Sequence, residues 1–336
     1  MVRSILRCFR MKNKPFLLKP AAKDYLWGGT RLNDDFGKNI SLNPLAETWE
    51  CSTHKDGPSV EADTGESLNS VLKKHPEYLG SHSLSATDGR AELPILVKLI
   101  DAKSDLSVQV HPDDNYAKRI ENSLGKTEMW YVIDSKADSE LVYGFSQDVT
   151  KEQVKNSATD GSILKYLNHV KVNKGDLFFI EPGTVHAIGA GCLIAEIQES
   201  SNITYRLYDY DRVDKNGNKR ELHLDKALDV VNLKSSASPR QPMRVYRYQS
   251  GCAHELLCRC RYFQVERIIL NTENRKLAVY KTFSNSFHSL LCVDGCGVLF
   301  GEGIMIPFFK GDCIFVPADS IPLKLHGKAQ ILDISC

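Results

Sequence analysis

The chain lacks any long hydrophobic run. None of its apolar stretches approaches the roughly 20 residues that a membrane-spanning helix needs, and its mean hydropathy is −0.30. It also lacks an excess of charge, because 43 Lys and Arg residues are balanced by 42 Asp and Glu residues, for a net charge of +1. These absences argue against a membrane partner and against a nucleic-acid partner.

A disulfide or CxxC signature is also missing. Ten cysteines are scattered over 336 residues, and Cys258 and Cys260 form only a CxC. The N-terminal stretch MVRSILRCFRMKNKPF is basic, and its apolar patch is too short for a secretory signal. We predict that residues 1–13 are a disordered extension or an upstream start. Because cytosolic disulfides are rare, we expect reduced thiols and a cytoplasmic protein.

Short alternating runs dominate the part of the chain before residue 200. They are rich in β-branched and aromatic residues and occur at 93–102, 106–111, 128–134, 177–181 and 192–198. This pattern predicts a mainly β fold, either a sandwich or a barrel. Helices with i, i+3, i+4 apolar spacing are predicted at 66–80, 150–168 and 223–234. Residues 208–222 predict a hairpin with solvated charges, because they contain the turn signal Asn-Gly-Asn.

An internal repeat points to two similar β units. NKGDLFFIEPGTVH (173–186) is answered by FKGDCIFVPADSIP (309–322), each with Lys-Gly-Asp, a strand and a proline turn. Four residues after the proline, the first copy has His186 and the second has Ile321. The second copy has therefore lost a potential ligand, and we interpret it as structural.

The Ser- and Pro-rich stretch SSASPRQPM is the best candidate for a domain boundary. The predicted parts after the extension are a catalytic domain at 14–234, a linker at 235–243 and a C-terminal domain without a metal site at 244–336.

Four polar residues near strand ends predict a metal site. Gln109 and His111 lie two positions apart and share one face of a strand, which Pro112 ends. Glu128 begins the next aromatic-rich strand, and His186 follows the tight Pro-Gly-Thr turn. Two imidazoles and a carboxylate, with an amide oxygen as a fourth partner, leave a position for water or substrate, as in catalytic zinc sites. Two alternatives stay open. Each residue could be an ordinary polar residue, and the spacing does not separate zinc from iron or manganese.

Ordered motifs give this chain a family resemblance. They are QVHPDD (109–114), GKTE (125–128), PGTVHAIGAG (182–191), EIQESSNITYRLYDY (196–210), DYLWGGTRL (24–32), AETWECSTHKDGPS (46–59) and LPILVKLIDA (93–102). In this order they resemble type I mannose-6-phosphate isomerase in its short bacterial form. The resemblance covers most of residues 16–234, and the C-terminal part fits only in outline.

The resemblance implies a fold, an activity and a metal. The fold is a cupin (jelly-roll-like) β-barrel with helical insertions, followed by a second, degenerate cupin-like barrel. The activity is the interconversion of mannose 6-phosphate and fructose 6-phosphate through an enediolate, with one Zn²⁺ ion. The metal ligands implied are His111, Glu128, His186 and, as the weakest assignment, Gln109.

Further roles follow from the same resemblance. Arg206 falls on the active-site arginine and Glu196 on a conserved Glu, while Lys126 falls on a position that lines the pocket. Because a neighbouring metal and arginine would lower its pKa, Lys126 is a candidate proton shuttle, and the general base is left open between Lys126 and Glu196. The substrate-binding positions implied are Lys98, Ser107, Glu47, Trp27 and Trp49. The chain departs from longer family members at two positions, where Gly125 replaces a His and Asn202 replaces an Asp.

Two other functions compete with the isomerase. The departures at Gly125 and Asn202 motivate a non-catalytic cupin that senses sugar phosphates. The two histidines and one carboxylate also match the iron triad of cupin oxygenases. In each reading the partner is a small molecule, and the oligomeric state is left open.

Overall fold

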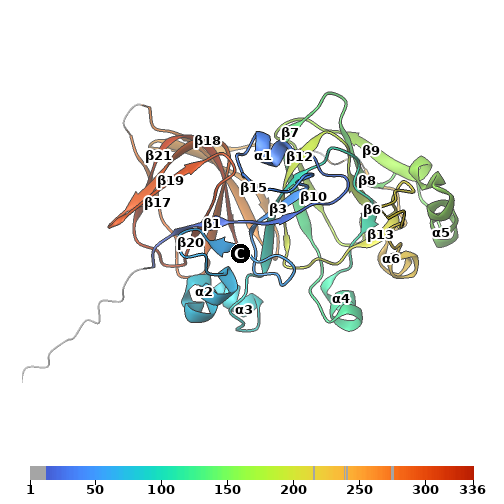
Figure 1. Ribbon diagram of the computed structural model, residues 1–336, viewed down its shortest axis with the longest axis horizontal. Coiled ribbons are helices and arrows are strands. Elements are labelled where there is room, and N and C mark those ends of the chain that lie inside the picture. Colours follow the sequence, from blue (N-terminus) through green and yellow to red (C-terminus); the bar gives the residue numbers. More distant parts are fainter. Residues whose placement is uncertain (1–12, 215, 238, 240, 274–275) are drawn as a thin grey trace, which may run out of the picture.

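The computed structural model describes residues 13–336 except 215, 238, 240 and 274–275 (Figure 1). The predicted extension at 1–12 lies outside the described residues. Asn13, the last residue of the predicted range 1–13, forms a bridge with Ser320. The fold is mainly β, as predicted. In Figure 1, two groups of antiparallel strands lie side by side, most helices lie along the lower edge and one end, and the short helix α1 lies at the top between the two groups.

Two sheets form the first barrel. The six-stranded sheet has the order β10 (Leu177–Ile180), β7 (Glu128–Ser135), β12 (Cys192–Glu199), β5 (Ile95–Asp101), β3 (Glu47–Cys51) and β2 (Ala21–Lys23). The five-stranded sheet has the order β13 (Tyr205–Tyr208), β6 (Val108–Val110), β11 (His186–Ile188), β8 (Glu140–Phe145) and β9 (Leu167–Lys171). Trp130 and Phe178 from the first sheet pack with Ile188 from the second in one buried core. All five predicted strand runs lie in this barrel.

A ten-stranded sheet forms the second barrel. Its main path is β14 (Tyr246–Gln249), β15 (Cys252–Arg259), β16 (Gln264–Asn271), β21 (Leu323–Ser335), β18 (His288–Gly301), β20 (Cys313–Val316), β1 (Phe16–Lys19) and β4 (Val60–Glu61). In addition, β17 (Ala278–Tyr280) pairs with β21, and β19 (Ile304–Phe309) pairs with β18. Ile268, Leu290, Ile314 and Leu325 are among the residues of its buried core.

The predicted division of the chain needs one correction. Residues 16–19 and 60–61 fall in the range 14–234 that was predicted as the catalytic domain, yet β1 and β4 belong to the second sheet. Strand β1 pairs with β20, and the ring of Phe16 stacks on Phe315 at 5.2 Å. The physical reason is that an exposed strand edge presents unpaired backbone groups, which β1 covers. The boundary at 235–243 stays a prediction.

The helices are short and lie outside the sheets. They are α1 (Arg31–Asp34), α2 (Leu68–Lys74), η1 (Pro76–Leu79), α3 (Ser81–Ala86), α4 (Asp114–Glu121), α5 (Lys151–Asp160), η2 (Ser162–Tyr166) and α6 (Leu224–Val230). The three predicted helical segments are confirmed as α2 with η1, α5 with η2, and α6. The sequence reading missed α1, α3 and α4. Val154 of α5 and Ala227 of α6 pack with Val108 and Leu207 of the five-stranded sheet.

The predicted repeat is also a structural repeat. Asp176 in the first Lys-Gly-Asp turn accepts a hydrogen bond from Asn173 N at 2.8 Å. In the second turn, Asp312 accepts one from Phe309 N, also at 2.8 Å. The same local hydrogen bond therefore precedes β10 in one barrel and β20 in the other.

Two further expectations concern the described part of the chain. None of its helices has both the length and the apolar character to cross a bilayer. The nine cysteines that the structure describes are all free thiols.

Candidate metal centre

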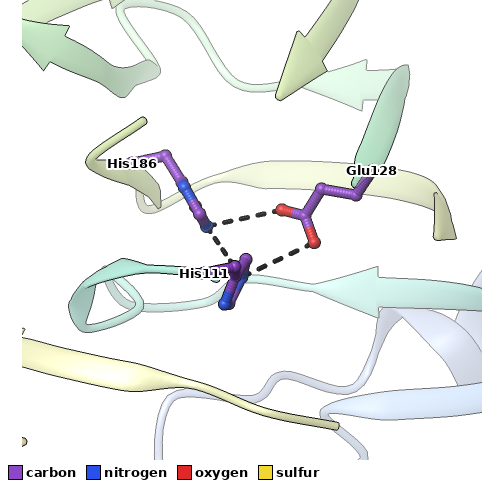
Figure 2. A group of neighbouring side chains, drawn as sticks. All are labelled: His111, Glu128 and His186. Atoms are coloured by element: carbon purple, nitrogen blue, oxygen red, sulfur yellow. Dashed lines mark hydrogen bonds and ion pairs between the residues drawn. The ribbon is translucent and has the colours of Figure 1, made fainter. Parts of the chain in front are cut away.

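Three polar side chains from separate segments meet inside the first barrel (Figure 2). His111 follows β6, Glu128 begins β7 and His186 begins β11. The Nε2 atoms of the two histidines are 3.1 Å apart. Glu128 Oε1 lies 3.4 Å from His186 Nε2, and Oε2 lies 3.6 Å from His111 Nε2. All three side chains are buried, so the barrel wall fixes their positions.

The backbone around the Pro-Gly-Thr turn explains how two distant segments are joined. Gly183 has φ +86°, a conformation that favours glycine, and its N–H donates to the carbonyl oxygen of His111 at 2.9 Å. Its carbonyl oxygen accepts from Asn232 N at 2.8 Å. His186 then pairs with Gln109 across β11 and β6. The turn therefore places His186 beside the strand that leads to His111.

The donor set fits a small tetrahedral cation. Ligand atoms about 2.0–2.1 Å from such an ion lie about 3.4 Å from one another, which matches the observed separations of 3.1, 3.4 and 3.6 Å. Apart from an ion pair of 3.3 Å with Lys126 Nζ, the two buried oxygens of Glu128 have no hydrogen-bond partner among the described residues. Because an unpartnered buried carboxylate is costly, this arrangement favours a bound cation.

The protonation of the three residues supports the same interpretation. Burial lowers the pKa of His186 to about 4 and holds the pKa of His111 well below its usual value. His186 Nδ1 lies 2.8 Å from the carbonyl oxygen of Thr184, so Nδ1 carries the proton and the Nε2 lone pair faces the cluster. Burial raises the pKa of Glu128 to about 7, although Lys126 opposes this shift. A bound cation would favour the deprotonated form of Glu128, because it places a positive charge beside the carboxylate.

Gln109 and Lys126 connect the cluster to a cavity. Gln109 Nε2 lies 3.4 Å from His186 Nε2, and both Gln109 and Lys126 line a cavity of about 270 Å³. This volume is near the lower end for small-molecule sites, which begin at about 300 Å³. Of the residues predicted from the sequence, the lining contains Trp27, Glu47, Lys98, Ser107, Gln109, Lys126, Glu196 and Arg206.

A buried charge network forms one wall of this cavity. Lys98 in β5 pairs with Glu196 in β12, and their side chains meet at 2.9 Å. Glu47 Oε2 lies 3.9 Å from Lys98 Nζ. Burial alone would raise the pKa of Glu196, but Lys98 and Lys126 lower it to about 2. Glu196 is therefore held in its charged form.

Trp49 needs a correction. It was predicted to bind substrate, but it is fully buried and does not line the cavity. Its indole N–H donates to Glu47 Oε2 at 2.7 Å, and its ring lies below Lys98 at 5.2 Å. Trp49 occupies a layer behind the cavity wall and positions Glu47 and Lys98.

Arg206 lies on the opposite sheet. It pairs with Gln109 across β13 and β6, and its Nε donates to Ser107 Oγ at 3.3 Å. Burial and the neighbouring Arg220 lower the pKa of Arg206. Two guanidinium groups near one cavity favour an anionic ligand between them.

The sequence reading missed Arg220. The charges of 208–222 were predicted to be solvated, but Asp209 is only 5% exposed. Asp209 accepts hydrogen bonds from Arg220 Nε and Nη2 at 2.7 and 2.5 Å, and it also pairs with Arg212. A bridge between Val213 and Lys219 closes the hairpin and brings Arg220 to the cavity lining. Only the spacing of Asp209, Arg212 and Arg220 could have signalled this cluster.

The two departures from longer family members have structural explanations. A Cβ at Gly125 would lie 2.6 Å from Asp114 N and 2.7 Å from Asp113 C, so α4 occupies the space that a side chain needs. Asn202 lines the cavity and donates to Asp56 Oδ2 at 3.0 Å. A His at position 125 would therefore require a different backbone path between this residue and the start of α4.

Comparisons with known proteins identify the family of this chain. The family profile described as phosphomannose isomerase type I, catalytic domain, matches residues 16–141, and the mannose-6-phosphate isomerase cupin domain matches residues 255–335. The mannose-6-phosphate isomerase ManA of Bacillus subtilis is 37% identical over 326 residues, covering 96% of this chain and 99% of its own length. The chain belongs to the mannose-6-phosphate isomerase family.

Other members of the mannose-6-phosphate isomerase family are similar as well. The probable mannose-6-phosphate isomerase GmuF of Bacillus subtilis is 46% identical over 223 residues, covering 65% of this chain and 69% of its own length. The crystal structure of a mannose 6-phosphate isomerase from Bacillus subtilis superimposes with a TM-score of 0.85 and 32% identity, covering 96% of this chain and 99% of that one. This family membership favours the isomerase over the sensing and oxygenase alternatives.

Proposed function

We propose that this protein is a zinc-dependent isomerase that interconverts mannose 6-phosphate and fructose 6-phosphate in the cytoplasm. The observation that carries the proposal is the buried cluster of His111, Glu128 and His186 beside a cavity lined by cations, in a chain of the mannose-6-phosphate isomerase family. We assign one Zn²⁺ ion to these three ligands, with Gln109 as a neighbour that can complete the site. Nitrogen and oxygen donors with an open position suit catalytic zinc.

The reaction moves a carbonyl between C1 and C2 of the open-chain sugar. A proton leaves the carbon next to the carbonyl, and the enediolate that results carries negative charge on its oxygens. When bound, zinc supplies Lewis acidity that stabilises this charge. Arg206, which lines the same cavity, donates to the developing oxyanions from a fixed position.

The choice between the two candidate bases favours Lys126. Glu196 is a weak base because Lys98 and Lys126 lower its pKa to about 2, against the effect of burial. Its second oxygen accepts from Trp130 Nε1 at 3.0 Å. We therefore assign the proton shuttle to Lys126, and we assign to Glu196 the role of holding Lys98.

The outer end of the cavity is suited to the substrate phosphate. Arg206 and Arg220 line it, and Asp209 orients Arg220 through two hydrogen bonds. A phosphate monoester carries nearly two negative charges at neutral pH, and planar guanidinium groups bind such groups through paired hydrogen bonds. Ser107 adds a hydroxyl beside Arg206.

A coupled assay for fructose 6-phosphate formation tests the proposal. Removal of metal by a chelator is expected to lower turnover by at least about 10³-fold, and Zn²⁺ is expected to restore it. Elemental analysis before and after chelation gives the metal content. Turnover that survives complete metal removal contradicts the metal role. Tight hexose phosphate binding without turnover at any zinc content supports the sensing alternative instead.

A further inference from the structure

The two barrels share a backbone framework that allows residues to be matched between them. Val132 exchanges two backbone hydrogen bonds with the first Lys-Gly-Asp turn, at 2.7 and 2.9 Å, and Cys292 makes the same two with the second turn, at 2.7 and 2.9 Å. Val132 pairs with Ile194, and Cys292 pairs with Ile331. A register shift follows at the corresponding place in each pair of strands. Val132 and Cys292 are therefore equivalent positions.

Counting along the paired strands from these positions matches the polar residues of the two barrels. Strands β7, β12, β5 and β3 correspond to β18, β21, β16 and β15, and the register shift between Trp49 and Cys51 recurs between Leu256 and Cys258. The matched pairs are Glu128 with His288, Glu196 with Asp333, Lys98 with Glu266, and Glu47 with His254. Each of these four polar positions of the first site is also titratable in the second barrel.

These four residues line a cavity in the second barrel. Its volume is about 1170 Å³, larger than the cavity of the first barrel. Asp333 accepts from Tyr280 OH at 3.0 Å, and its other oxygen lies 2.6 Å from His288 Nδ1. Glu266 Oε2 lies 3.4 Å from His254 Nδ1. A half-buried polar network of paired carboxylates and imidazoles therefore lines this cavity.

The charge of this cavity favours an anion. Glu266 and Asp333 are the only Asp or Glu side chains in the described lining; each is paired with a histidine, and Glu266 also pairs with Arg247 at 2.9 Å. Burial opposes the charged form of His288, but Asp333 raises its pKa. The remaining charged side chains of the lining are all cationic, and they are Arg247, Arg259, Arg261 and Lys281. Cations therefore exceed carboxylates around the cavity.

We propose that the second barrel holds a binding site for a small sugar phosphate, at the position that corresponds to the active site of the first barrel. Cationic donors at His288 and Lys281 bind the phosphate, while the carboxylates of Glu266 and Asp333 accept from sugar hydroxyls. The exposed rings of Phe283 and Tyr248 line the entrance. Ile321 stands where the repeat would place the equivalent of His186, so this site binds its ligand without that metal ligand.

The test measures binding to the zinc-loaded protein, without turnover as a readout. Fructose 6-phosphate is titrated by calorimetry into the wild type and into Lys281→Gln and His288→Gln. All three tryptophans, Trp27, Trp49 and Trp130, belong to the first barrel, so tryptophan fluorescence reports the first site alone. We expect two sites in the wild type, and the second is weakened about 10-fold or more by each variant. The fluorescence titration is expected to stay unchanged.

Lys324→Gln provides a matched control, because it removes an exposed cation from the same barrel outside the cavity lining. This control is expected to keep both sites. A single calorimetric site in the wild type, or a second site that both variants leave unchanged, overturns the proposal. If His288→Gln does not fold, Lys281→Gln still decides, since Lys281 lies on the exposed rim. A failure here leaves the isomerase assignment intact, because that assignment is tested by turnover and chelation.

Discussion

The two barrels have the same strand framework but satisfy their buried polar groups differently. In the first barrel, Glu128 meets two histidines and Lys126, yet its oxygens have no hydrogen-bond partner among the described residues. In the second barrel, both oxygens of Asp333 have partners, Tyr280 and His288. A buried acceptor that the protein leaves unsatisfied is expected at a site that an external group completes. The comparison teaches that the framework is shared, and that the first barrel leaves its carboxylate open to a cation whereas the second pairs its carboxylate with protein groups.

A second difference lies in the sheet opposite the shared strands. The five-stranded sheet of the first barrel carries β6, β11 and β13, which supply Gln109, His186 and Arg206. The second barrel has Ile321 after its corresponding proline turn. Among the described residues, the second barrel therefore lacks the counterpart of His186, although His254 and His288 line its cavity.

The largest expected effect follows from replacing the unsatisfied carboxylate. Glu128→Gln keeps the size of the side chain but removes the charge that a cation needs, so we expect loss of bound metal and a fall in turnover of at least about 10³-fold. Metal content and the coupled assay measure both. In the second barrel, Asp333→Asn is the control and is expected to keep one metal ion per chain. Equal metal loss in both variants would remove the distinction between the barrels.

Next in size is the loss of a buried cation in either barrel. Lys98→Met leaves Glu196 and Glu47 without their cation, and Arg267→Met removes the nearer partner of Glu255, at 2.6 Å, and leaves only Arg244 at 3.5 Å. Each change is expected to destabilise the fold by about 3–5 kcal/mol, measured by urea unfolding. Only Lys98→Met is expected to lower turnover per folded molecule, because Arg267 joins β16 to Tyr131 on the other barrel and does not line the small cavity.

A smaller effect is expected at the outer end of the first cavity. Arg220→Ala removes one guanidinium from the proposed phosphate site, so KM for mannose 6-phosphate is expected to rise about 10- to 100-fold with a smaller change in kcat. Lys219→Ala is the matched control, since Lys219 is exposed on the same hairpin and pairs with Asp211. An equal rise in KM for both variants would mean that only the overall charge of the hairpin matters.

The smallest expected effect is on the pH dependence of stability, to which the histidines of the two barrels contribute differently. Burial lowers the pKa of His186 to about 4, whereas hydrogen bonds with Cys252 and Glu266 raise the pKa of His254 to about 9. Because the pKa of His254 is higher in the folded protein than in the unfolded chain, its protonation stabilises the fold. This stabilisation is complete below about pH 6.5 and is lost as the pH rises through about 9. Allowing for solvent screening at this half-buried group, we expect a loss of about 1 kcal/mol. Urea unfolding at pH 6 and pH 9.5 should show this loss in the wild type and not in His254→Gln.

Much of the fold and of the metal cluster could be predicted from the sequence, for local reasons. Strand alternation puts Gln109 and His111 on one face, and a glycine with positive φ shapes the turn before His186. The helix α4 was missed although Asp113 caps it, because its short amphipathic pattern lies between two strands. Short helices of this kind depend on tertiary packing more than on propensity.

The sequence by itself determined which residue types exist in each barrel unit, the repeat that relates the units, and the order of the motifs. Only the tertiary structure decided that β1 joins the second sheet, that Trp49 lies behind the cavity wall, and that Arg220 reaches the cavity through Asp209. The physical reason is range: turns and strand alternation depend on neighbours in the chain, whereas pairing between distant strands and the burial of charges depend on the packing of the whole molecule.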